Sequence, residues 1–318
     1  MNRIALRIKS YGLPLLILSI FRILLIRIYK LFGINRFVIR KIFDYKMYLD
    51  IYDQGLSKQL IKYKKRELDH RYILEKTLKK GSTVLDIGAN IGYYALMELN
   101  LIGESGRLIA VEPSPSNVDL LKKNIALNDK KNNTRIISGA ISSSTGNGKF
   151  HLSYASNLNT FHNYGTVTKH LSGETIDVNT YKVIDVLNED EIERGLDLIR
   201  MDVEGHEVDV LNGLIDEIVS GKLLPAIVFE THISRYTKEN DMSKTLKKLF
   251  SLGYKVKYMA SSWEEGTLMI NKYGYTETAS IKTDGVTRSI FENIDNKDAI
   301  NIICNHGGAR TVYIERSQ

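Results

Sequence analysis

The stretch MDVEGHE, residues 201–207, places three acids and a histidine around a single glycine. It follows the apolar run LDLIR and precedes a strongly helical stretch. Charged residues rarely end a buried strand without partners, so these side chains could form a reaction centre or a cofactor clamp. Acids are also favoured at the start of any helix, which would explain Glu204 and Glu207 without a function.

Four side chains of this region and the next predicted strand end could exchange protons. Glu204 and His206 lie in the first stretch, and Glu230 and His232 lie in IVFETH. A positioned carboxylate or imidazole can act as a general base, so all four are candidate catalytic residues. His206 could equally face solvent at a helix start, and His232 could bind a substrate. Magnesium accepts oxygen ligands of the kind that Asp202, Glu204 and Glu230 offer, but their spacing requires no metal and we assign none.

A glycine-containing turn, LDIGANIG, follows the first predicted strand. Gly88 and Gly92 let the chain turn sharply, and the helix that follows offers unpaired N–H groups to a ligand. The turn lacks the G-x-G-x-x-G spacing of pyrophosphate binders. Asp86 would also repel a diphosphate, whereas it suits a cationic ligand such as the amino group of S-adenosylmethionine.

Glu112 ends the second predicted strand, about twenty residues after this turn. An acid there can accept both hydroxyls of an adenosine ribose. Its alternative role is a favourable charge near a helix start. Because Asp86 and Glu112 end neighbouring strands, at the edge where open α/β sheets bind ligands, we favour the ribose.

Short apolar strands alternate with helices along much of the chain, which predicts right-handed parallel βαβ units. The pattern predicts seven strands, at 83–87, 107–113, 134–141, 196–203, 225–230, 253–260 and 309–316. Residues 142–195 interrupt the alternation and predict a β-rich excursion. Residues 261–308 form a second insertion, and residues 40–80 predict connecting helices.

Composition excludes several classes of protein. The chain has 318 residues, 43% hydrophobic and 25% charged, as in ordinary globular domains. The net charge of +7 is concentrated in the first 80 residues, without an aromatic-interleaved basic patch near the sheet edge, so we expect no nucleic-acid partner. The lone Cys304 excludes a disulfide framework and is compatible with a cytoplasmic location.

The segment 11–34 is long and apolar but is interrupted by Arg22, Arg27 and Lys30. Arginine near a bilayer centre costs roughly 2.5–3.5 kcal/mol, which disfavours a membrane span. The three cations fall within one helical sector, so the segment predicts a basic amphipathic helix. Such a helix either lies at a membrane surface or packs against the main domain.

Five segments occur in an order that resembles the FkbM family of S-adenosylmethionine-dependent methyltransferases. They are VLDIGANIGYYAL, IAVEPSPSNVDLLKKNIALN, GAIS, LIRMDVEGHEVDVLNGL and IVFETH. The resemblance covers roughly 82–260, and its most specific part is DVEGHE followed by VLNGL. It implies an α/β, Rossmann-like class I methyltransferase fold with three α/β/α layers and a mostly parallel seven-stranded sheet whose last strand is antiparallel. Residues 1–80 would then form an N-terminal helical segment, and residues 81–318 the methyltransferase domain.

The resemblance also implies roles for particular residues. Asp86, Gly88, Ala89, Asn90 and Gly92 would form the loop on the methionine side of S-adenosylmethionine. Glu112 would hold the ribose, Ala140 would flank the adenine, and Asp202 would face the cofactor. Family members often have a small residue where this chain has His206.

The function implied is O-methylation of a sugar hydroxyl in a glycan, glycolipid or glycosylated metabolite. A basic helix at 11–34 makes an acceptor at the cytoplasmic membrane surface plausible. The alternatives are a methyltransferase for another small molecule or lipid and a nicotinamide-dependent oxidoreductase, which also uses a glycine turn and an acid at the position of Glu112.

Overall fold

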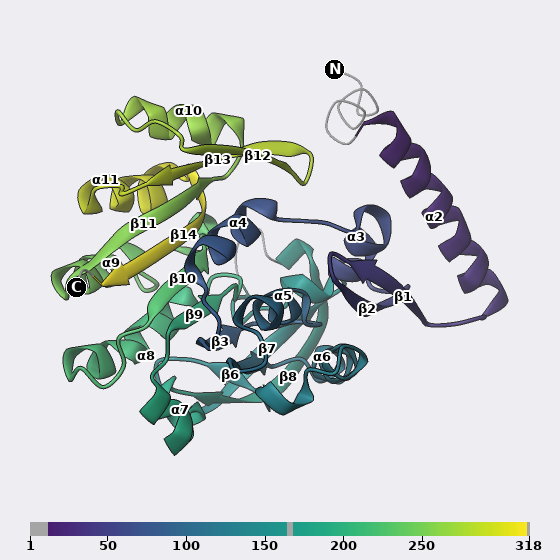
Figure 1. The fold of residues 1–318 in the computed structure, drawn as a ribbon, viewed down its shortest axis with the longest axis horizontal. Coiled ribbons are helices and arrows are strands. Elements are labelled where there is room, and N and C mark those ends of the chain that lie inside the picture. Colours follow the sequence, from purple (N-terminus) through teal and green to yellow (C-terminus); the bar gives the residue numbers. More distant parts are fainter. Residues whose placement is uncertain (1–11, 164–167, 317–318) are drawn as a thin grey trace.

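The computed structural model describes residues 12–163 and 168–316, and its centre is a nine-stranded sheet (Figure 1). The strands, in spatial order, are β12 (Ala279–Thr283), β13 (Val286–Glu292), β11 (Tyr254–Ser261), β14 (Ala309–Arg316), β10 (Ala226–Glu230), β9 (Leu198–Met201), β3 (Thr83–Ile87), β4 (Arg107–Glu112) and β5 (Thr134–Ser138). Neighbours from β10 to β5 are parallel. β14 is antiparallel to both β10 and β11, which confirms the expected last antiparallel strand.

The expected count of seven strands needs one correction. The insertion 261–308 adds β12 and β13 as an antiparallel hairpin beyond β11. It also contributes α10 (Glu264–Lys272), α11 (Asn296–Ile300) and a π-helical turn, Asn301–His306. β12 alternates between more and less exposed residues, whereas β13 contains four consecutive buried residues, and the sequence did not predict either strand. The seven-stranded core is therefore extended at one edge.

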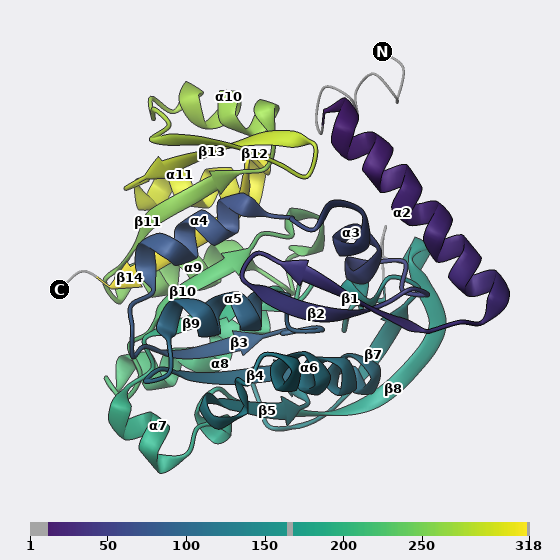
Figure 2. The same ribbon diagram turned by 45° about the vertical axis from the view of Figure 1, so that its right-hand side comes forward.

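Helices cover both faces of the sheet, as expected for three α/β/α layers (Figure 2). The members of one layer are α4 (Leu68–Thr77), α5 (Tyr93–Ile102) and α6 (Pro115–Leu127), and those of the other are α8 (Glu207–Val219), α9 (Met242–Ser251) and α11. The central strands β3 and β9 are buried along their whole length, as their continuous apolar runs predict. A short helix, α7 (Glu189–Arg194), precedes β9 at the amino end of the sheet.

The excursion after β5 forms a second, three-stranded sheet. Its members are β6 (Ala140–Ile141), β7 (Gly146–Ser153) and β8 (Leu171–Tyr181), in the order β6-β8-β7. The β-rich excursion is confirmed, but the single strand expected at 134–141 is divided at Gly139. A Cβ at this position would lie 2.9 Å from the Asn179 carbonyl oxygen, so only glycine permits β8 to pass so close.

The N-terminal region contains a β-hairpin that the sequence did not reveal. β1 (Phe37–Ile42) and β2 (Tyr45–Asp50) are antiparallel and precede α3 (Leu56–Tyr63), so the expectation of helices throughout 40–80 was wrong. The hairpin is fixed to α6, since Asn124 Oδ1 accepts from the Tyr48 amide at 2.7 Å. Its apolar side chains join the α4–α6 layer, so this region shares a core with the sheet.

The helix α2 (Leu13–Phe32) lies along one side of the molecule and contacts α3 (Figure 1). Arg22 donates to the Lys62 carbonyl oxygen at 2.5 Å, and Lys30 lies 4.8 Å from the centre of the Tyr52 ring. Two of the three cations of this helix, Arg22 and Lys30, therefore contact residues outside it. The outward side is apolar, with large exposed side chains at Leu13, Ile17, Leu18, Ile20, Phe21, Leu24, Ile28, Leu31 and Phe32.

The expected amphipathic segment is thus a helix with a packed face and an exposed apolar face. Residue 11 and the residues before it lie outside the described ranges. Within those ranges, no helix has both the length and the apolar character needed to cross a membrane.

Candidate functional site

The loop after β3 passes directly beneath the end of β9. Gly88 has φ +77°, and a Cβ there would lie 2.4 Å from the Asp202 carbonyl oxygen. Asn90 also adopts a positive φ of 51°, and Gly92, at φ +93°, is the residue before α5. The glycines therefore permit a tight turn and a close approach of two strand ends, which leaves backbone exposed to a ligand on the open side.

Glu112 organises this loop from the end of β4. Its carboxylate accepts hydrogen bonds from the amides of Asn90 and Ser114, both at 2.9 Å, and from the Asn117 side chain at 3.1 Å. Only 4% of the residue is exposed. Burial raises the pKa of Glu112 to about 7, against the opposite effect of the three donors.

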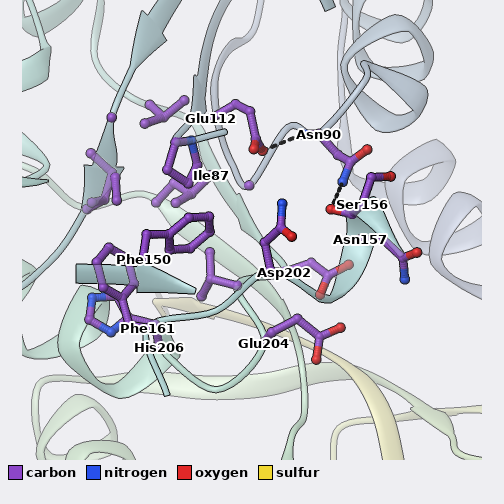
Figure 3. A pocket seen from close by; sticks show the side chains of 18 residues that line it. Ile87, Asn90, Glu112, Phe150, Ser156, Asn157, Phe161, Asp202, Glu204 and His206 are labelled. Carbon is purple, nitrogen blue, oxygen red and sulfur yellow. Dashed lines mark hydrogen bonds between the residues drawn. The ribbon is translucent and has the colours of Figure 1, made fainter. Parts of the chain in front are cut away.

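A cavity of about 490 Å³, including its open mouth, lies over these strand ends (Figure 3). Five expected cofactor residues line it, namely Gly88, Asn90, Glu112, Ala140 and Asp202. Ala89 and Gly92 belong to the same loop but are not among the lining residues.

Asp86 requires a correction. It is fully buried within β3 and is not a lining residue. Its carboxylate oxygen Oδ1 lies 3.1 Å from Arg200 Nη1, and the same guanidinium reaches Asp202 Oδ2 at 3.3 Å. Arg200 therefore compensates Asp86, so the carboxylate has a partner inside the sheet and not in the cavity.

The excursion closes one side of the cavity with aromatic rings that sequence reasoning missed. Phe150 from β7 and Phe161 lie edge to face, with ring centres 5.0 Å apart. The backbone of Ser156, from the turn Ser156–Leu158, accepts from the Asn90 side chain at 3.1 Å (Figure 3). No motif marks these residues, because they reach the cavity only when the second sheet folds over the strand ends.

His206 lies on this aromatic side. Its ring stacks on Phe161 with centres 4.5 Å apart, and its Nε2 atom lies 3.1 Å from the Ser142 hydroxyl. The residue is 8% exposed and precedes α8. Burial lowers the pKa of His206, which favours the neutral ring. His206 lines the same cavity as Glu204 but forms no hydrogen bond or ion pair with Glu204, Glu230 or His232, and its role as a base stays a prediction.

The remaining candidates meet at the ends of β9 and β10, in what we call the strand-end cluster: Asp202, Glu204, Glu230 and His232. The Nε2 atom of His232 lies 3.4 Å from Glu230 Oε1, 3.6 Å from Glu204 Oε2 and 3.9 Å from Asp202 Oδ1. Asp202 and Glu204 also line the cavity, so the cluster borders it directly.

Glu207 holds the histidine of this cluster from behind. Its Oε1 atom lies 2.9 Å from His232 Nδ1 and accepts from the Val203 and Gly205 amides, both at 3.3 Å. Burial favours a neutral imidazole, but the carboxylates of Glu207 and Glu204 raise the pKa of His232 well above its ordinary value. Glu207 is therefore more than a helix-start charge.

Arginines compensate the carboxylates of the cluster, and two of them are not indicated by any sequence motif. Arg310 Nη1, from β14, lies 2.5 Å from Glu230 Oε1, and Arg235 Nη2 lies 3.7 Å from Glu204 Oε2. Burial and the nearby Glu230 charge raise the pKa of Asp202 to about 7. Arg200 carried a signal, because a lone cation within the apolar run LDLIRM requires a buried partner.

Comparisons with known proteins place these features in a family. The model of the methyltransferase FkbM domain matches residues 86–256, more than half of the chain. The methyltransferase sdnD of Sordaria araneosa is 29% identical over 195 residues, covering 53% of this chain and 73% of the relative. The ribosomal RNA large subunit methyltransferase E of Lawsonia intracellularis (strain PHE/MN1-00) is 35% identical over 69 residues, covering 20% of this chain and 33% of its own.

Comparison with solved structures gives matches of low sequence identity. An FkbM methyltransferase from Methylobacillus flagellatus KT has a TM-score of 0.40 and 13% identity, over 74% of this chain and 54% of its own. The M. jannaschii TYW2 structure, in complex with AdoMet, has a TM-score of 0.40 and 15% identity, over 89% of this chain and 88% of its own. The chain thus spans about half the length of the FkbM structure.

The family match favours methyl transfer over the alternative of a nicotinamide-dependent oxidoreductase. A glycine-turned loop, a buried acid at the second strand end and a ring-lined cavity beside them fit the nucleoside and amino-acid ends of S-adenosylmethionine. This chain belongs to the methyltransferase FkbM family, and S-adenosylmethionine is its cofactor.

Proposed function

We propose that this protein is an O-methyltransferase that methylates a sugar hydroxyl of a lipid-linked saccharide. One observation carries the proposal: Asp202 and Glu204 belong both to the cofactor cavity and to the strand-end cluster. An acceptor placed against the cluster would therefore meet the cofactor at the cavity wall. O-methylation needs such a neighbour, because a sugar hydroxyl is a poor nucleophile until its proton is removed.

Different residues of the cavity would bind different parts of the cofactor. Gly88 and Asn90 would hold the methionine end, Glu112 the ribose hydroxyls, and Ala140 with Phe150 and Phe161 the adenine. S-adenosylmethionine supplies a methyl group already activated on a sulfonium sulfur. The protein then needs mainly to align the acceptor oxygen, exclude water and accept one proton.

The strand-end cluster provides the proton acceptor. The acceptor oxygen forms a bond to the methyl carbon, the carbon–sulfur bond breaks with its electron pair on sulfur, and the hydroxyl proton passes to a carboxylate of the cluster. Glu204 and Glu230 are the carboxylates nearest the His232 Nε2 atom. Burial opposes the anionic form of both groups and raises the pKa of Glu204, whereas Arg310 outweighs burial at Glu230 and lowers the pKa of that carboxyl, which favours the anion that a proton acceptor requires.

The apolar face of α2 supports an acceptor at a membrane surface. Phe21, Leu24 and Ile28 are each at least 45% exposed, and Arg27 is exposed beside them. Apolar helical faces with nearby cations bind anionic membranes by burying the apolar side chains at the headgroup boundary. A lipid-linked saccharide would present its sugar hydroxyls next to a protein held there.

Vesicle co-sedimentation tests this membrane contact. With anionic phospholipid vesicles, the wild-type chain should sediment, and Phe21→Glu/Leu24→Glu/Ile28→Glu should remain in the supernatant. The control is Leu268→Glu, an equally apolar and 61% exposed residue on α10, which should still sediment. Unchanged sedimentation of the triple variant would contradict the membrane contact. A wild-type chain that stays in the supernatant, for example as a dimer formed through the apolar face of α2, would contradict it as well.

Calorimetry tests the cofactor assignment on which the function depends. S-adenosylmethionine should bind the wild-type chain with one site per chain, and NAD should give no saturable signal. Tight NAD binding without a signal from S-adenosylmethionine would overturn the proposed function.

A further inference from the structure

We propose that Asp202, Glu204 and His232 form a binding site for a divalent cation such as Mg²⁺ or Mn²⁺. One ligand atom from each residue can be chosen so that all three lie within 4.8 Å of one another. The three residues come from two neighbouring strand ends and surround a common point at the wall of the cofactor cavity. Carboxylate oxygens with one imidazole nitrogen are a ligand set that these cations accept.

The carboxylates of the proposed ligand set lie too far from His232 for good direct hydrogen bonds, and the hydrogen-bond partner of its Nε2 atom is Glu230, outside the set. His232 Nε2 lies 3.6 Å from Glu204 Oε2 and 3.9 Å from Asp202 Oδ1. Both separations exceed the roughly 2.7–3.2 Å of a good N–H···O bond. Ligands about 2.1 Å from one octahedral cation lie about 3.0 Å apart when adjacent and about 4.2 Å when opposite. The observed separations exceed the adjacent value by about 0.6–0.9 Å, so the side chains would have to move closer together around a bound cation.

The orientation of the histidine is the second, independent observation. Its Nδ1 atom is directed at the buried Glu207 carboxylate at 2.9 Å, which itself accepts from two backbone amides. Metal-binding histidines almost always donate their other ring N–H to a carboxylate or carbonyl in this way. The arrangement leaves Nε2 directed toward Asp202, Glu204 and Glu230.

The local charges leave room for a cation. Four carboxylates surround His232, those of Asp202, Glu204, Glu207 and Glu230. Among the described residues, the guanidiniums paired with them are those of Arg200, Arg235 and Arg310. Arg200 and Arg310 are also shared with Asp86 and Glu67, so negative charge remains in excess when the ring is neutral.

The catalytic role of the cation rests on the proposed function. A divalent cation that binds the acceptor hydroxyl lowers its pKa and orients its oxygen. The hydroxyl proton would pass to Glu230, the carboxylate of the strand-end cluster outside the ligand set. The oxygen then forms its bond to the methyl carbon while the carbon–sulfur bond breaks. No other reactant is needed.

Binding of Mn²⁺, followed by its electron paramagnetic resonance signal, tests the site without any methyl acceptor. The full chain, first treated with a chelator, should take up one Mn²⁺ that Mg²⁺ displaces. His232→Gln should weaken uptake by at least about a hundredfold, and Glu207→Gln by about 10–100-fold through loss of the supported ring orientation. The matched control is Glu193→Gln, an exposed acid on α7 at the opposite end of β9, which should bind Mn²⁺ as the wild type does.

Two results would overturn the proposal: no Mn²⁺ uptake by the wild-type chain, or uptake that His232→Gln leaves unchanged. The cluster would then be an ion-pair network around a protonated His232. S-adenosylmethionine affinity, measured on the same samples, shows that each variant is folded. If the wild-type chain binds S-adenosylmethionine but takes up no Mn²⁺, only the cation site is refuted, whereas absent cofactor binding by the wild type refutes the proposed function.

Discussion

At the ends of β3 and β4 a single carboxylate, that of Glu112, is surrounded by neutral donors from its own loops. At the ends of β9 and β10 several carboxylates surround His232 and depend on arginines from distant parts of the chain. The first arrangement suits recognition of hydroxyl groups on a bound nucleoside. The second suits movement of a proton or a cation. We propose that this sheet edge combines a half that binds the cofactor and a half that moves the proton, called below the binding half and the reactive half.

The largest expected effect separates turnover from binding. Glu230→Gln keeps the shape of the side chain but removes the charge beside His232. Loss of a general base typically costs about 10²–10⁴-fold in rate, so kcat should fall by that order while the affinity for S-adenosylmethionine stays within about twofold. Methyl-transfer kinetics and calorimetry on the same preparation measure both. A kcat near that of the wild type would show that Glu230 is not the proton acceptor, and the ends of β9 and β10 would then lose their proposed role in the reaction.

The reverse effect is expected at Glu112. Glu112→Ala leaves the buried Asn90 and Ser114 amides without their acceptor and removes the ribose ligand. Hydrogen bonds to charged groups contribute about 1.5–3 kcal/mol, so affinity for S-adenosylmethionine should fall roughly 10–150-fold. Calorimetry checks this change, with Glu104→Ala, an exposed acid, as the control. Cofactor affinity equal to that of the wild type would refute the ribose role.

The pH dependence of stability should reveal both buried acids. Burial raises the pKa of Glu112 from 4.5 to about 7, and that of Asp202 from 3.8 to about 7. At pH values between the unfolded and the native pKa, the native carboxyl keeps a proton that the unfolded chain has released. The contribution of each group to the free energy of unfolding therefore falls by about 1–3 kcal/mol as the pH rises through this range.

Chemical denaturation at pH 5 and at pH 8, one below and one above these pKa values, measures this difference. Glu112→Gln should remove much of the pH dependence, because glutamine does not titrate. A stability that instead rises with pH by the same amount in wild type and variant would show that Glu112 is ionised throughout.

The smallest effect concerns His206. If this histidine is the base, His206→Ala slows turnover and spares cofactor binding. Its stacking on Phe161 indicates the opposite result, a loss of about 0.5–1.5 kcal/mol in cofactor affinity with little change in kcat. His206→Phe should restore affinity by replacing the ring. A kcat that falls in both variants at unchanged affinity would favour the base.

The binding half was largely predictable from sequence because its parts are close together in the chain. The loop at 88–92 and Glu112 each end a recognisable apolar strand, so topology alone places them at one edge. The exception is Asp86, two positions before the loop, whose side chain pairs with that of Arg200 on the neighbouring strand β9. The face of the sheet on which a side chain lies depends on its position along the strand. A motif that gives only residue types does not show which face that is.

The reactive half could be predicted only in part. Glu204, Glu230 and His232 follow strand ends and were identified, whereas Arg310 reaches Glu230 from the last strand. No local pattern indicates which arginine will neutralise which carboxylate, since the pairing depends on β14 lying beside β10. The same reason hid Phe150 and Phe161, which reach the cavity through the second sheet.

Transfer of an isotope-labelled methyl group from S-adenosylmethionine tests the central claim most directly. The purified chain is incubated with glycolipid extracts, and nuclear magnetic resonance identifies the labelled atom. We expect label on the oxygen of a saccharide hydroxyl with the wild-type chain and almost none with Glu230→Gln. Label on nitrogen or carbon, or equal labelling by Glu230→Gln, would contradict a sugar O-methyltransferase that deprotonates its acceptor at the strand-end cluster.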